Sequence, residues 1–98
     1  MGKSQRDKGY RGERNLVNYF KEHGIEAIRV PLSGASNFAK GDVVIKGKYR
    51  AEVKLRKDGF KMIYKWLGDN DMLFIKANNK QYLAVIPLDL LITLLKDK

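Results

Sequence analysis

Apolar and polar residues alternate along two neighbouring segments, residues 42–46 and 49–55, which are separated by Gly47 and Lys48. Because successive side chains of a strand point to opposite faces, this alternation predicts a β-hairpin with one core face and one polar face. Apolar residues occupy the odd positions Val43, Ile45, Ala51, Val53 and Leu55. Apart from Val44, the even positions are charged: Asp42, Lys46, Arg50, Glu52, Lys54 and Arg56. The hairpin therefore carries acids and cations together on one face.

The rest of the chain predicts three helices and three further strands. The predicted elements are a helix at 9–24, strands at 25–30, 42–46 and 49–55, a helix at 60–67, strands at 72–77 and 81–86, and a helix at 87–95. Residues 1–8 read as a flexible basic arm, and residues 31–41 as a loop by composition. The order α-β-β-β-α-β-β-α predicts an α/β (α+β) domain over residues 9–98, with a mixed central sheet flanked by helices.

Length and charge narrow the class of protein. A chain of 98 residues has room for one core, and it contains no Cys for disulfides or thiolate metal sites. No apolar run is long enough to cross a bilayer, and the charged N-terminus does not resemble a signal peptide, so we predict a cytoplasmic protein. The net charge of +9 favours a polyanionic partner such as nucleic acid. Solubilising surface charge is the simpler alternative, and a membrane surface is the third.

The length of the hairpin loop decides which residues face each other. A three-residue loop, Lys46 to Lys48, would put Asp42 directly opposite Glu52, whereas a two-residue loop would mix the two faces. In the first register the two Cβ atoms would lie roughly 4.5–5.5 Å apart. Two carboxylates at that distance suit a hard divalent cation such as Mg²⁺, and Lys54 follows on the same face. A solvated polar face with Lys–Glu pairing is the alternative.

Glu13 is a third acid that the pattern turns inward. It lies three and four residues before Leu16 and Val17 and seven before Phe20, so it belongs to the stripe that packs on the sheet. An acid in the first helical turn can simply favour the helix dipole. A carboxylate aimed at the acidic cluster from a covering helix explains its inward direction as well.

These residues form a pattern that resembles a known nuclease family. Gly41-Asp42, nine further residues and then Glu52-Val53-Lys54 resemble the signature of the PD-(D/E)xK, restriction-endonuclease-like superfamily. The segments RGERNLVNYFKEHG (11–24) and IRVPLSG (28–34) resemble the archaeal-type Holliday-junction resolvases and their viral relatives. The resemblance covers residues 9 to about 67. Gly41 replaces the proline of the nominal motif, and the motifs leave the chain from Met72 onward unassigned to any resolvase.

The resemblance implies a role for each motif residue. Asp42 and Glu52 would bind Mg²⁺, for which Mn²⁺ would substitute, with the backbone carbonyl of Val53 as a further ligand. Lys54 would be the catalytic lysine that orients or helps to deprotonate the attacking water. Glu13 would complete the acidic cluster through water, and Ser33 would contact substrate or metal-bound water. It also implies a prokaryotic or viral origin.

The function that we predict is Mg²⁺-dependent hydrolysis of a DNA phosphodiester, at Holliday junctions above all. The predicted phosphate-binding residues are Lys3, Arg6, Lys8, Arg11, Arg14, Arg29, Lys40, Arg50, Arg56, Lys57, Lys61 and Lys65. Two symmetric cuts call for a homodimer, with no membrane and no small-molecule substrate involved. The alternatives are a nicking or flap nuclease of a virus or mobile element, and a non-catalytic nucleic-acid-binding module.

Two apolar features leave their partners open. The last helix has apolar residues around most of its circumference, a pattern that fits packing in the core and a dimer contact equally well. Tyr64 and Trp66 could stack on unpaired bases, although their helical spacing favours core or interface packing.

Overall fold

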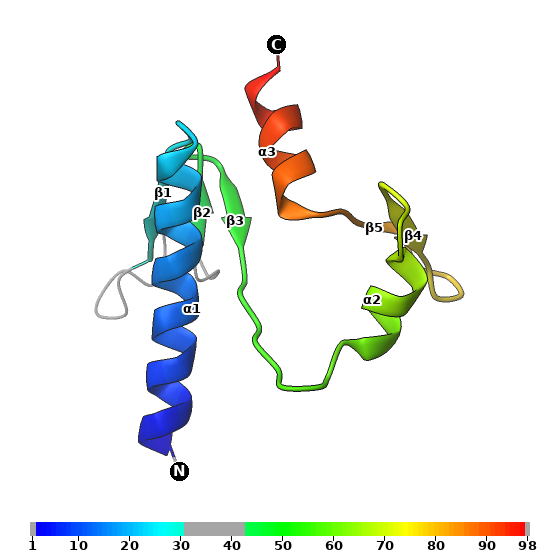
Figure 1. Ribbon diagram of the computed structural model, residues 1–98, viewed down its shortest axis with the longest axis horizontal. Helices are drawn as coiled ribbons and strands as arrows, with labels where there is room; N and C mark the ends of the chain where they lie inside the picture. Colours follow the sequence, from blue (N-terminus) through cyan, green and yellow to red (C-terminus); the bar gives the residue numbers. More distant parts are fainter. Residues whose placement is uncertain (1, 31–42, 98) are drawn as a thin grey trace. The chain divides into compact units, whose positions relative to one another are not determined.

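The computed structural model describes residues 2–30 and 43–97, with side chains from residue 11 onward. The chain divides into two compact units, Met1–Leu55 and Arg56–Lys98, and each is described by itself. The element order is α1-β1-β2-β3-α2-β4-β5-α3, which confirms the predicted order and the α/β (α+β) class (Figure 1). The single nuclease domain predicted over residues 9–98 stays a prediction.

Helix α1 (Gly2–Glu22) opens the first unit and begins earlier than predicted. Residues 2–8, which we predicted to be a flexible arm, form its first turns. No proline interrupts this segment, and its Lys, Arg and Gln residues favour helix, so a single Gly9 costs only about 1 kcal/mol. The predicted start near Gly9 is therefore wrong, because the helical pattern of apolar residues begins only after Gly9, whereas the polar residues before it also form helix.

Gly24 caps the C-terminal end of α1, as predicted. Gly24 has a φ of +82°, a left-handed conformation that glycine adopts without a steric penalty. Its N–H donates to the Lys21 carbonyl at 3.0 Å, and the N–H of Ile25 donates to the Phe20 carbonyl at 2.9 Å. These two bonds form a Schellman motif. Both Phe20 and Ile25 are buried, so the cap turns the chain from the helix directly into the core.

The strands β1 (Ala27–Arg29), β2 (Val43–Ile45) and β3 (Tyr49–Ala51) form an antiparallel sheet in that order. Each is shorter than its alternating pattern predicted, because the pattern reports which side chains are buried while a strand also needs a paired neighbour. Helix α1 lies along this sheet in Figure 1. The buried core of the unit consists of Val17, Phe20, Ile25, Ala27, Val43, Val44 and Ile45.

The second unit contains helix α2 (Lys61–Leu67), strands β4 (Leu73–Ile75) and β5 (Leu83–Val85), and helix α3 (Leu88–Lys96). The two strands form an antiparallel hairpin whose turn contains Asn79 at a φ of +63°, as the Asn78-Asn79-Lys80 segment predicted. Gly68 follows α2 and donates its N–H to the Tyr64 carbonyl at 3.0 Å, which confirms the predicted C-terminal cap. None of the helices in residues 2–30 and 43–97 is both long and apolar enough to span a membrane.

The arrangement of the strands and the packing of two aromatic residues differ from the prediction. The described strands form two separate antiparallel sheets instead of one mixed central sheet, because each pairing joins strands that follow each other in the chain. Tyr64 and Trp66 are 75% and 53% exposed, so they do not pack in the core, and their packing at an interface stays a prediction. Helix α2 buries no residue, whereas α3 buries Ile92 and leaves Leu94 exposed. The choice between core and dimer contact for α3 stays open.

Candidate active site

The β2–β3 hairpin has the register that the sequence favoured. Val43 pairs with Ala51 and Ile45 pairs with Tyr49, so the loop contains three residues, Lys46 to Lys48. The Lys48 N–H donates to the Ile45 carbonyl at 3.1 Å, and the φ angles of Lys46 and Gly47 are +57° and +71°. These are the φ signs of a type I′ turn, whose twist matches that of the strands. Lys48 is one residue more than this turn needs, and the resulting odd loop length keeps the apolar and the charged side chains on opposite faces of the hairpin.

Three predicted site residues, Ser33, Lys40 and Asp42, lie outside the described residues. The printed sequence places Asp42 one step beyond the last pair of the register, Val43 with Ala51. Within the described part of the chain, no group of three His, Cys, Asp or Glu side chains is close enough together to hold a metal ion.

Glu52 and Lys54 emerge together just after β3. The Lys54 Nζ atom lies 2.7 Å from the Glu52 Oε2 atom, and each side chain is 58% exposed. An exposed pair of this kind contributes little to stability. The pair instead matters for chemistry, because a carboxylate and an ammonium group lie side by side and are both accessible to a ligand. Val53 between them is half-buried, as the alternation predicted.

Glu13 lies on the inward side of α1, as predicted, and it bonds to the sheet. The Arg29 Nε atom donates to Glu13 Oε1 at 3.0 Å, and the side chains are 28% and 18% exposed respectively. Arg29 is on β1, where it pairs in register with Val43. Directly opposite residues of an antiparallel pair share one face, so α1 packs on the face that carries Val43.

This packing corrects the expected position of the helix. We predicted that the Glu13 helix covers the face of Asp42 and Glu52, but it covers the apolar face instead, because burial of Val17 and Phe20 drives the contact. Glu13 therefore approaches the end of the strands from the core side. A Cβ atom added at Gly12 would come within 2.6 Å of Leu55 Cδ1, so the neighbour of Glu13 touches the neighbour of Lys54.

The family model for archaeal Holliday junction resolvases (Hjc) matches residues 4–91 of the chain. The chain belongs to this family. Its members are junction-resolving endonucleases of the restriction-endonuclease-like superfamily, and they act on branched DNA. Neither the curated proteins nor the solved structures contain a match. The match extends past Met72, so it includes the C-terminal hairpin and the start of α3, up to Leu91, which the sequence motifs alone left unassigned.

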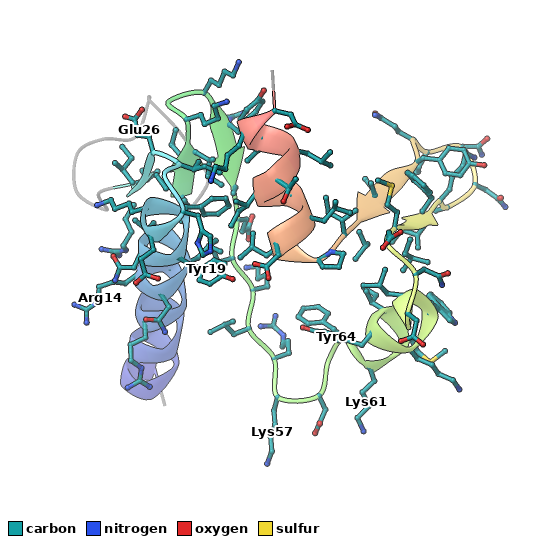
Figure 2. The ribbon with its side chains drawn as sticks, turned by 45° about the horizontal axis from the view of Figure 1, so that its top comes forward. Arg14, Tyr19, Glu26, Lys57, Lys61 and Tyr64 are labelled. Atoms are coloured by element: carbon teal, nitrogen blue, oxygen red, sulfur yellow. The ribbon has the colours of Figure 1, made fainter. Side chains whose placement is uncertain are left out.

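For a member of a junction-resolving family, the exposed cations are candidate phosphate contacts. Of the predicted DNA-binding residues with described side chains, all but Arg29 are exposed: Arg11, Arg14, Arg50, Arg56, Lys57, Lys61 and Lys65. Figure 2 shows Arg14 projecting outward from α1, and Lys57 and Lys61 extending away from the ribbon of the second unit. The side chains of Lys3, Arg6 and Lys8 lie outside the description.

Arg29 makes a contact that the sequence did not predict. It is one of the predicted phosphate-binding cations, but its guanidinium group is half-buried against Glu13. The sequence does contain a signal for this contact: Glu13 faces inward on the helix, and the strand that follows carries a basic residue, Arg29, among apolar ones. The two are sixteen positions apart, so no local periodicity relates them.

Proposed function

We propose that this chain is a divalent-metal-dependent endonuclease that hydrolyses phosphodiester bonds at four-way DNA junctions. The proposal is supported mainly by the register of the β2–β3 hairpin, together with membership of the resolvase family. If the pairing of Val43 with Ala51 continued by one residue, it would bring position 42 opposite Glu52. We infer that Asp42 and Glu52 stand side by side and form the metal site.

The donor set fits a hard cation. Glu52 offers an exposed carboxylate, and Asp42 would supply the second one that Mg²⁺ takes in proteins. The carbonyl of Val53 and, through water, the Glu13 carboxylate would complete the set, and Mn²⁺ would replace Mg²⁺. When bound, the metal supplies Lewis-acid polarisation of the phosphate and a more acidic water.

The chain's own residues orient the reactants. Lys54, which lies 2.7 Å from Glu52, would exchange that contact for the attacking water or a phosphate oxygen as substrate enters. Its positive charge would also offset the negative charge that grows on the phosphate in the transition state. Ser33 would contact the substrate or a metal-bound water. We propose that this set constitutes the catalytic machinery.

Binding of DNA would depend on charge, with little reading of bases. The excess of nine positive charges and the exposed Arg and Lys side chains suit phosphate contacts, which orient a duplex without specifying its sequence. Selectivity would then come from the shape of branched DNA. Two symmetric cuts across a junction require two active sites, so we propose a homodimer with C2 symmetry.

The substrate class is tested by incubating the protein with four-way junction, flap, nicked and linear duplex DNA of equal length, each with Mg²⁺ and with EDTA. We expect Mg²⁺-dependent cleavage of the junction in preference to the other substrates, with paired cuts on opposing strands. Preference for flaps or linear DNA would contradict junction resolution while leaving nuclease chemistry intact. Binding that EDTA leaves unchanged, with no cleavage of any substrate, would indicate a non-catalytic module.

A further inference from the structure

The ion pair between Glu13 and Arg29 is better protected from water than the pair between Glu52 and Lys54. Its side chains are 18% and 28% exposed, whereas both Glu52 and Lys54 are 58% exposed. Partly buried charges are screened less than surface charges. Loss of one partner leaves the other as an uncompensated charge in a poorly solvated place. Arg29 therefore fixes the Glu13 carboxylate more firmly than a surface contact could.

The backbone places this pair at the end of the hairpin where the proposed metal site lies. Arg29 pairs in register with Val43, which directly follows Asp42 in the sequence. On the other side, Gly12 is in contact with Leu55, which directly follows Lys54. The Glu13–Arg29 pair is thus anchored beside both segments that supply the proposed catalytic residues.

We propose that Arg29 is a positioning residue that acts through Glu13, in addition to or in place of a contact with DNA phosphate. Resting on the proposed function, the inference assigns Arg29 the task of holding the Glu13 carboxylate in one orientation, toward the water shell of the metal. Outer residues that orient a metal's ligands typically change affinity or activity by about 10–100-fold when they are replaced.

A double-mutant cycle on Glu13 and Arg29 tests this role. Single-turnover junction cleavage is measured at saturating protein for wild type, Glu13→Gln, Arg29→Gln and the double variant. Each single substitution is expected to slow cleavage by about 10–100-fold. The double variant should match Glu13→Gln within about twofold, because a residue that acts only through Glu13 has nothing to position once that carboxylate is gone. Arg29→Lys should recover part of the rate.

Three outcomes would overturn the inference. The first is full additivity of the two losses, and the second is an unchanged rate in Glu13→Gln. The third is an Arg29→Gln variant that binds the junction at least tenfold more weakly yet cleaves normally when saturated, which would indicate a phosphate contact. The charge-reversed pair Glu13→Arg with Arg29→Glu controls for folding: it should keep the wild-type urea midpoint without recovering cleavage.

The same cycle measured on Mn²⁺ binding separates this inference from the proposed function. Both single variants and the double variant are expected to bind Mn²⁺ about 10–100-fold more weakly than wild type, by the same factor in each. If the four proteins bound Mn²⁺ with these relative affinities but the wild type cut no DNA, the proposed function would fail and the positioning role would stand. If all four proteins bound Mn²⁺ equally while wild type cleaved junctions, the positioning role would fail alone.

Discussion

Replacement of Glu52 by glutamine is expected to slow junction cleavage by roughly 10²–10³-fold at saturating protein, the usual effect of removing one group that stabilises charge in a transition state. Gln has the shape of Glu but not its charge, and the side chain is 58% exposed, so the fold should not change. The lost carboxylate would weaken the metal site and also release Lys54 from its 2.7 Å contact. Single-turnover kinetics on a labelled junction measure the effect.

Glu26→Gln is the matched control for this substitution. Glu26 belongs to the same unit, its side chain is exposed, and it precedes β1 at a distance in sequence from the proposed site (Figure 2). Neutralising either acid on a basic surface should leave junction binding unchanged, since phosphate contacts depend on the cations. Equal cleavage rates for Glu52→Gln and Glu26→Gln would remove Glu52 from the catalytic set.

Replacement of Phe20 by alanine is expected to lower the free energy of unfolding by about 3–5 kcal/mol, the range for truncating a buried aromatic side chain. Phe20 is 1% exposed, so its ring belongs to the buried core of the first unit, and its carbonyl also accepts the N–H of Ile25 in the helix cap. A loss of that size is a large share of the roughly 5–15 kcal/mol that holds a small domain folded. Urea denaturation followed by circular dichroism measures it.

The surface counterpart is Ile28→Ala, on the outer face of β1, where the side chain is 47% exposed. This variant should lose no more than roughly 0.5 kcal/mol. Both variants are compared with wild type at one protein concentration, because dimerisation would otherwise shift the midpoint. Similar losses in the two variants would show that α1 does not anchor the sheet through Phe20.

Local patterns predicted the elements that depend on short-range chemistry. Alternation over residues 42–55 specified the hairpin and its odd loop, because a two-residue loop would have placed the charged Glu52 opposite the buried Val43. Gly24, Gly68 and Asn79 were recognised as cap and turn residues, and each has a positive φ. These residues act through the backbone itself, so the sequence alone suffices to identify them.

Features that depend on packing between distant segments were predicted less well. The contact of Glu13 with Arg29 joins residues sixteen positions apart, and it exists because α1 packs on the apolar face of the sheet. The same packing corrected the expected position of the helix. Tyr64 and Trp66 lie in a segment of helical periodicity, but periodicity alone does not supply a surface for them to pack against, and both are exposed.

The central claim is that Asp42 and Glu52 together hold the metal ion that drives junction cleavage. It is tested most directly by single-turnover cleavage of a synthetic four-way junction by wild type and by Asp42→Asn, each in Mg²⁺ and in EDTA, with junction binding measured on the same samples. We expect rapid paired cleavage by wild type in Mg²⁺ only, and roughly 10²–10³-fold slower cleavage by the variant with unchanged binding. Cleavage by Asp42→Asn at the wild-type rate, or by wild type in EDTA, would contradict the claim.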